Sequence, residues 1–208
     1  MRSKTSRKPA NTVARGAAGA ARRDQIVKIA ADLFGAKGYD GTSLRDIAEA
    51  SGITKAALYY HFPDKERLYE DVVVTRITAL NDAVKEAITK SEDPVERVRL
   101  FLTASAQRVD RDRSGWLASS HIFWSLDRTK HGSAIVKVRD EFEHLLRDLI
   151  ADAIKQKRFR LVDPAVVGRL LLSGLNQIPR WHKPSGRLTA AQVMEQYLAI
   201  VLNGILVG

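Results

Sequence analysis

The chain has no cysteine among its 208 residues, and this absence excludes disulfide bonds and cysteine-bound metal sites. Apolar runs are short as well, because none approaches the roughly 20 residues that a membrane-spanning helix requires. The N-terminus also lacks the apolar core of a signal peptide. These absences predict a cytoplasmic protein with no membrane partner. Strand-type alternation of polar and apolar residues is almost missing too, which leaves helices as the main structural element.

Acidic residues are missing from residues 1–23, which contain seven arginines and lysines. The whole chain has a formal net charge of +10, so this segment carries most of the excess. Its remaining residues are mainly small or polar, and we predict a disordered basic arm over residues 1–21. Such an arm either keeps the chain soluble or slides along DNA phosphates and strengthens binding without reading sequence. A strongly basic protein of this kind most often binds nucleic acid.

Helical periodicity marks the part of the chain that follows the arm. Apolar residues recur on one face over residues 26–34 and predict a helix that ends at Gly38. Ser43 begins a capping box and therefore a short second helix. Gly52 then turns the chain, and Thr54 caps a short third helix. Two short helices joined by a turn and supported by a first helix form a helix-turn-helix.

Longer helical segments follow this module. The expected ranges are 64–89, 94–109, 115–127, 133–158, 164–180 and 189–202. We therefore predict an all-α fold of nine or ten helices. It comprises a helix-turn-helix DNA-binding domain at residues 22–68 and a ligand-binding and dimerisation domain at residues 69–208.

The third helix has an unusual composition for either a core or a wet surface, because "KAALYYHF" combines three aromatic residues with a lysine and a histidine. In a helix-turn-helix the second helix enters the major groove, and its N-terminal residues, here 54–56, meet base edges. The small side chain of Ala56 permits close approach. Tyr59 and His61, further along, can donate hydrogen bonds to phosphates. We expect Phe62 to pack inside the module instead.

Residues 22–75 resemble the DNA-binding domain of the TetR family of bacterial transcriptional repressors. The resemblance is carried by Phe34-x3-Gly38-Tyr39, Thr42-Ser43, Asp46-Ile47-Ala48, Gly52 and Leu58-Tyr59-Tyr60-His61-Phe62 followed by Lys65. It implies an all-helical ligand domain and a homodimer that binds a palindromic operator in double-stranded DNA. The DNA contacts that it implies are at Thr42, Ser43, Arg45, Thr54, Lys55, Ala56, Tyr59, Tyr60, His61 and Lys65.

The second domain has an aromatic and largely apolar interior that also contains polar groups. Polar side chains inside an apolar region need hydrogen-bond partners, and a bound ligand supplies them. We therefore predict a ligand pocket, although aromatics at helical spacing also make an ordinary core. The candidate ligand-binding residues are Trp116, His121, Phe123, Trp124, Phe142, Asn176 and Trp181.

The C-terminal pattern "RWHKPSGRLTAAQVMEQYLAIVLNGI" resembles a subgroup of TetR repressors that respond to acyl-CoA thioesters, including actinobacterial repressors of cholesterol-ring catabolism. The preceding helix departs from that subgroup at Leu172 and Asn176. The resemblance therefore implies a small-molecule effector of the acyl-CoA class without defining the acyl group.

Two C-terminal helices carry more apolar surface than one subunit is expected to bury, which predicts a four-helix bundle between two subunits. The residues concerned are Leu170, Leu171, Leu175, Ile178, Val193, Tyr197, Ile200 and Val201. The predicted function is a dimeric, ligand-responsive repressor that an acyl-CoA thioester releases from its operator. The alternative is a DNA-binding architectural protein that needs no ligand.

An enzyme is the third reading, and we do not favour it. Glu141-x-x-His144 has the spacing of a di-iron ligand pair, but the chain lacks the second such pair that a di-iron site requires. Sequence motifs for a phosphate-binding loop, a zinc protease or a nucleophilic serine are also missing. We expect no catalytic residues, no metal and no cofactor.

Overall fold

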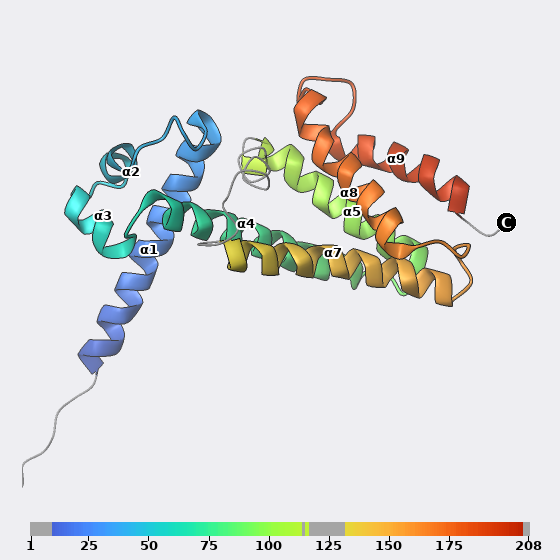
Figure 1. Cartoon of the computed structure of the whole chain (residues 1–208), viewed down its shortest axis with the longest axis horizontal. Helices are drawn as coiled ribbons and strands as arrows, with labels where there is room; N and C mark the ends of the chain where they lie inside the picture. The colour runs from blue at the N-terminus through green and yellow to red at the C-terminus, as the bar shows by residue number, and fades with distance from the viewer. Residues whose placement is uncertain (1–9, 114, 117–131, 206–208) are drawn as a thin grey trace, which may run out of the picture. The chain divides into compact units, whose positions relative to one another are not determined.

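The computed structural model describes residues 10–113, 115–116 and 132–205, which form eight α-helices and no β-strand (Figure 1). The all-α class is therefore confirmed. The expected number of nine or ten helices is too high for this part of the chain, and the expected helix over 115–127 lies almost wholly outside the described residues. Within the described ranges, no helix combines the length and the apolar character that crossing a membrane requires.

The chain divides into two compact units at Val72, which lies inside helix α4 (Lys65–Ile88). The first unit contains α1 (Ala10–Lys37), α2 (Leu44–Ala50) and α3 (Lys55–His61). Helix α1 begins at Ala10, so residues 10–21 are helical where we expected a disordered arm. The segment is rich in alanine, the strongest helix former, and this propensity outweighs its glycines and its lack of a predicted cap.

The turns of the first unit follow the sequence signals closely. Gly38 and Gly52 adopt φ angles of +75° and +64°, a region that residues with a side chain rarely occupy. The Ser43 hydroxyl accepts from the Asp46 backbone N–H at 3.1 Å, and the Asp46 carboxylate accepts from the Ser43 N–H at 2.9 Å. Thr54 caps α3 by accepting from the Ala57 N–H at 3.2 Å. Local contacts, namely two glycine turns and two helix N-caps, therefore fix the helix-turn-helix.

The second unit is built from part of α4 together with α5 (Pro94–Arg111), α7 (Gly132–Lys155), α8 (Pro164–Trp181) and α9 (Ala190–Ile205). Helix α5 packs against α7, α8 and α9, and α8 also packs against α7 and α9 (Figure 1). One continuous apolar core joins them, with Phe101, Leu146 and Leu175 fully buried. Burial of these side chains is the main favourable term in the stability of the unit.

Polar contacts hold the ends of α5, α8 and α9 together. The carboxylate of Asp110 on α5 accepts from the first N–H groups of α9, at 2.7 Å from Ala190. The Arg113 guanidinium donates to the carbonyl of Pro179 on α8 at 2.8 Å. His182 is buried, and its Nε2 lies 2.7 Å from the Leu188 carbonyl, which ties down the loop between α8 and α9. These contacts set which side chains face the space between α5 and α8.

Helix α5 is capped by Asp93, whose carboxylate accepts from the N–H groups of Val95 and Glu96 at 2.9 Å and pairs with Arg158 at 2.6 Å. Because removal of an N-cap costs about 1 kcal/mol, we expect Asp93→Ala to lower the free energy of unfolding by about that amount in urea denaturation. Asp93→Asn is the matched control, because asparagine retains the capping oxygen and loses only the charge. Equal stability of wild type and Asp93→Ala would contradict this account of the cap.

The same bonds, led by the one from the Glu96 N–H, lower the pKa of Asp93 below its usual value. A carboxyl whose pKa is lower in the folded state stabilises the fold above its unfolded pKa of about 3.9. This contribution is lost as the pH falls through the lower, folded pKa. The Asp93→Asn variant is therefore expected to lose less stability than wild type on acidification below about pH 4.

Candidate nucleic-acid interface and ligand pocket

Helix α3 presents an exposed polar and aromatic face in the first unit. Tyr60 is 87 % exposed and Tyr59 is 44 % exposed, although tyrosine is usually at least partly covered. Lys55 is exposed at the N-terminal end of the helix, and its Nζ lies 5.7 Å from the centre of the Tyr59 ring. The opposite face is anchored by Leu58, which is fully buried. Leu58 therefore anchors the helix, and the hydrogen-bond donors of Lys55, Tyr59 and Tyr60 remain exposed.

The expected DNA-contacting residues lie in three groups. Lys55, Ala56, Tyr59, Tyr60 and His61 are on α3, with Thr54 as its cap; all are exposed except His61, which is half-buried. Ser43 and Arg45 are at the start of α2, where Arg45 is exposed and pairs with Glu49. Lys65 is at the start of α4, with its Nζ 4.1 Å from the centre of the Tyr39 ring.

Thr42 is the exception among these residues, because its side chain is buried. Its hydroxyl lies 2.8 Å from the Gly38 carbonyl and 3.2 Å from the Leu33 carbonyl, and it can donate its hydrogen to either. The threonine therefore fastens the end of α1 to the start of the helix-turn-helix. Its side chain is not presented to a partner, contrary to the role that we carried over from the family pattern.

Two arginines of α1 contact the helix-turn-helix through their side chains. Arg22 donates to the Ser51 carbonyl at 2.9 Å, next to the turn between α2 and α3. Arg23 pairs with Asp71, and its guanidinium lies 4.7 Å from the centre of the Phe62 ring. Phe62 is fully buried, as expected. Part of the basic charge near the N-terminus is therefore used within the unit rather than offered to DNA.

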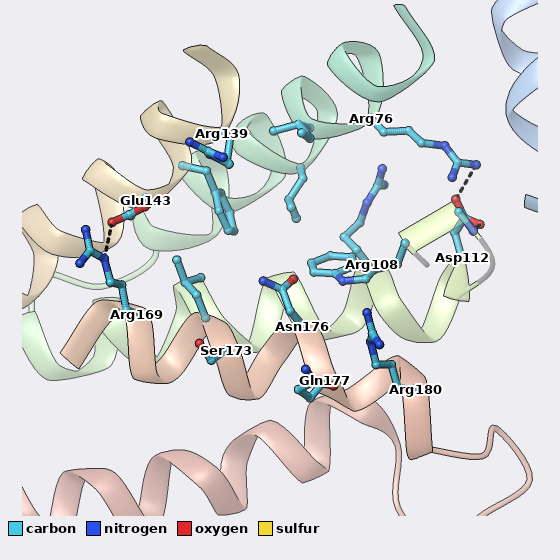
Figure 2. A pocket seen from close by; sticks show the side chains of 16 residues that line it. Arg76, Arg108, Asp112, Arg139, Glu143, Arg169, Ser173, Asn176, Gln177 and Arg180 are labelled. Carbon is cyan, nitrogen blue, oxygen red and sulfur yellow. Dashed lines mark hydrogen bonds and ion pairs between the residues drawn. The ribbon is translucent and has the colours of Figure 1, made fainter. Parts of the chain in front are cut away.

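The second unit contains a cavity of about 570 Å³ between α4, α5, α7 and α8 (Figure 2). Its volume is within the range of known small-molecule sites. The residues that line it are Arg76, Ile77, Leu80, Arg108, Asp112, Gly115, Trp116, Arg139, Phe142, Glu143, Arg169, Leu172, Ser173, Asn176, Gln177 and Arg180.

The walls of the cavity differ in character. Helix α8 contributes mainly polar side chains, which recur along it at Arg169, Ser173, Asn176, Gln177 and Arg180. The rest of the lining contributes most of the apolar surface, including Leu80 of α4 and Phe142 of α7, together with three of the five arginines and both acidic residues. A ligand that fills the cavity therefore meets both apolar side chains and charged groups.

Charge around the cavity is strongly positive, with five arginines against two acidic residues. Figure 2 shows Arg139, Glu143 and Arg169 at one end and Arg76, Asp112 and Arg180 at the other. Three arginines pair with acids: Arg76 with Asp112 at 2.9 Å, Arg139 with Asp140 at 2.9 Å and Arg169 with Glu143 at 3.6 Å. Such a lining favours an anionic ligand.

Three of the expected ligand-binding residues line the cavity, namely Trp116, Phe142 and Asn176. Trp181 does not line it and is 52 % exposed, because it lies on a different face of α8 from Asn176 and Arg180. The expected residues His121, Phe123 and Trp124 lie outside the described part of the chain.

The arginines of the cavity were not among the predicted ligand-binding residues, because DNA binding also explains the positive charge of the chain. A signal was present, since polar residues recur every three or four positions along α8, from Arg169 to Arg180. Apolar residues fill the opposite, buried face of the same helix. These polar residues are exposed, and they line the open side of the cavity rather than the apolar core.

The candidate di-iron pair is exposed on α7. Glu141 and His144 are both exposed, and the Nδ1 of His144 lies 2.6 Å from the Asp140 carbonyl. No group of three potential metal ligands occurs among the residues that the structure describes. This arrangement is typical of a solvated helix face.

Comparisons with known proteins match both units. Residues 26–72 match the family of bacterial regulatory proteins of the tetR type, and residues 91–205 match the "Tetracyclin repressor-like, C-terminal domain". The chain belongs to the TetR family. Its members are DNA-binding transcriptional regulators rather than enzymes, so the expectation of a ligand-responsive regulator without catalytic activity agrees with the family.

The relatives agree with this assignment over most of their length. The HTH-type transcriptional repressor KstR2 of Mycolicibacterium smegmatis is 29 % identical over 89 % of this TetR-family chain and 91 % of its own. The regulator PfmR of Thermus thermophilus is 34 % identical, with a TM-score of 0.75 over 86 % of this chain and 97 % of its own. AibR, solved with isovaleryl coenzyme A and operator DNA, is 28 % identical, with a TM-score of 0.77 over the same shares.

The exposed face of α3 predicts separate effects for two substitutions. Lys55→Ala is expected to weaken operator binding by roughly tenfold or more and to relax its base preference, as loss of a base contact does. Tyr59→Phe is expected to weaken binding to all sequences alike, because it removes a phosphate contact. Gel shifts at fixed salt concentration measure both effects.

Lys90→Ala is the control, because it removes the same charge from an exposed site outside the helix-turn-helix. If Lys55→Ala leaves both affinity and preference unchanged, α3 does not read the operator.

Proposed function

We propose that this TetR-family regulator is a homodimeric repressor that binds a palindromic operator through α3 and is released by an acyl-CoA thioester. The observation that carries the effector assignment is the cavity of the second unit, which combines apolar side chains with five arginines. An acyl-CoA has the matching parts, namely an apolar acyl group, a chain with amide and hydroxyl groups, and phosphates. The likeness to AibR, which was solved with a CoA thioester, and to KstR2 supports the same class.

Helix α4 is the element through which a ligand can act on DNA binding. It contributes Arg76, Ile77 and Leu80 to the cavity, and the same continuous helix begins at Lys65, a candidate phosphate contact. A ligand shifts the regulator only if it binds one conformation better than the other. Two recognition helices of a dimer must lie about 34 Å apart to enter successive major grooves. We propose that the ligand favours a conformation with a different spacing.

The ion pair between Arg76 and Asp112 connects this helix to the charge of the cavity. Arg76 approaches Gly115 so closely that a side chain at position 115 would collide with its guanidinium. An anionic ligand competes with Asp112 for Arg76, because the guanidinium has a fixed number of donors. Exchange of a carboxylate partner for a ligand anion therefore couples occupancy of the cavity to the position of α4.

The proposed dimer uses the exposed faces of α8 and α9. Leu170 is 59 % exposed and Ile200 is 73 % exposed, and Val166 is 62 % exposed one turn before Leu170. Apart from Glu195, α9 contains no charged residue. An uncharged helix face with large apolar side chains is expected to be covered by a partner. A second copy of the chain covers it with the same two helices, as a four-helix bundle.

Only part of the predicted dimer surface is available for that role. Leu171, Leu175, Ile178 and Val193 are buried in the core of their own subunit. Tyr197 and Val201 are partly buried against the same core. The face left for a partner is therefore the line from Val166 and Leu170 on α8 to Ile200 on α9. The sequence pattern alone did not separate the inward from the outward side of α8, because both are apolar.

The effector proposal predicts that at least one CoA thioester in a panel of acyl groups binds with a dissociation constant below about 100 μM and weakens operator binding. Asn176→Leu is expected to blunt this response while leaving operator affinity without ligand nearly unchanged, because it removes a polar group of the cavity. Calorimetry measures ligand binding, and gel shifts measure operator release.

Gln156→Leu is the control, since it replaces an exposed amide outside the cavity in the same way. Failure of every thioester to bind would rule out the acyl-CoA class.

The dimer proposal predicts that Leu170→Glu or Ile200→Glu converts the protein to a monomer and abolishes high-affinity operator binding, because the charge would be buried in the interface. Light scattering after gel filtration measures the mass. Leu161→Glu is the matched control, because Leu161 is 92 % exposed and lies outside α8 and α9. A dimer that survives both substitutions would require another interface.

A further inference from the structure

Two of the five arginines around the cavity, Arg108 and Arg180, have no acidic partner within residues 10–113, 115–116 and 132–205. The other three each lie within 4 Å of a carboxylate. Arg108 is half-buried, so its charge is partly removed from water, whereas Arg180 is exposed. A guanidinium cannot lose its proton to relieve this situation. An unpaired charge in a partly enclosed space is unfavourable unless an anion offsets it.

The two unpaired arginines come from helix ends that are held together. Arg108 is in the last turn of α5, and Arg180 is in the last turn of α8. The bond from Arg113 to the Pro179 carbonyl joins these ends at 2.8 Å. Figure 2 shows both side chains on the side of the cavity that holds Arg76 and Asp112, away from the pair of Arg169 and Glu143. Both side chains therefore lie at the same end of the cavity.

We infer that Arg108 and Arg180 form an anion subsite that binds an oxyanion group of the effector. Guanidinium groups bind phosphates and carboxylates through two parallel hydrogen bonds, so the pair supplies both charge and orientation. This inference rests on the proposed function, and it identifies the end of the cavity that receives the charged part of the ligand. The oxyanion is either a phosphate of CoA or a carboxylate at the end of the acyl group.

Helix stabilisation is the competing explanation for these two residues, because basic side chains near a helix C-terminus interact favourably with its dipole. Arg111 separates the two explanations. It is also in the last turn of α5 and is exposed, but it does not line the cavity. A stability effect alone would therefore appear in an Arg111 variant, whereas a ligand effect would not.

The experiment compares wild type, Arg108→Met/Arg180→Met and Arg111→Met by calorimetry. Three ligands share one acyl chain length: an acyl-CoA, the same acyl group on pantetheine without phosphates, and a pantetheine thioester whose acyl group ends in a carboxylate. Circular dichroism and thermal melting establish that each variant is folded. If the arginines bind a CoA phosphate, the double variant loses about tenfold or more in affinity for acyl-CoA and none for the uncharged pantetheine thioester.

If the arginines bind an acyl carboxylate, the double variant instead loses affinity for the carboxylate-bearing thioester alone. Arg111→Met retains wild-type affinity in both cases. Equal affinity of wild type and double variant for all three ligands would overturn the anion subsite and leave the acyl-CoA proposal intact.

If wild type binds none of the three thioesters, the proposed function fails, and inorganic pyrophosphate and glutarate then test the subsite alone. Binding of either anion by wild type but not by the double variant supports the subsite. Absence of binding by wild type overturns the subsite as well.

Discussion

The positive charge of five guanidinium groups around one cavity is the constraint from which the proposed regulation follows. Like charges that share a partly enclosed space raise the energy of the fold, and here Asp112, Asp140 and Glu143 offset three of the five. Arg108 and Arg180 have no acidic partner among the described residues. Natural sequences retain such groups where function requires them. In our proposal an anionic effector supplies the missing partner, and occupancy of the cavity is therefore expected to stabilise the unit.

In the proposed mechanism α4 connects the cavity to the first unit, because this one helix contributes residues to the cavity and residues that pack in the first unit. Tyr69 of α4 packs edge-on against Phe34, with 4.8 Å between the ring centres, and Asp71 of α4 forms an ion pair with Arg23. At the other end, Asn81 donates to the Val138 carbonyl on α7 at 3.1 Å. We therefore propose that a change in the ion pair of Arg76 acts on a helix that has contacts in both units. No new contact between ligand and DNA is needed for regulation.

Local signals were sufficient to predict the helix-turn-helix. Ser43, Gly52 and Thr54 act on their immediate neighbours, so caps and turns could be assigned without tertiary information. The buried state of Phe62 followed from its position at the end of α3. The role of Thr42 could not be predicted, because its bonds reach back to Gly38 and Leu33 across the end of α1.

The cavity was predicted less completely, because its residues come from four helices. Trp116, Phe142 and Asn176 were recognised by composition, which does not depend on the fold. Arg76 and Arg108 were not recognised, because packing of the helices brings Arg76 to Asp112 and Arg108 to α8. Residues 10–21 differ from the expectation in another way. Their composition indicated disorder, but they are rich in alanine and form the start of α1.

The central claim is that the cavity and the operator compete through one conformational equilibrium. Linkage requires each ligand to weaken the other by the same factor. The most direct test is calorimetric titration of an acyl-CoA into the free protein and into its complex with operator DNA. We predict that the affinity for the acyl-CoA is lower in the operator complex, by the same factor by which the acyl-CoA weakens operator binding. Equal affinities of the free protein and the complex would contradict the account.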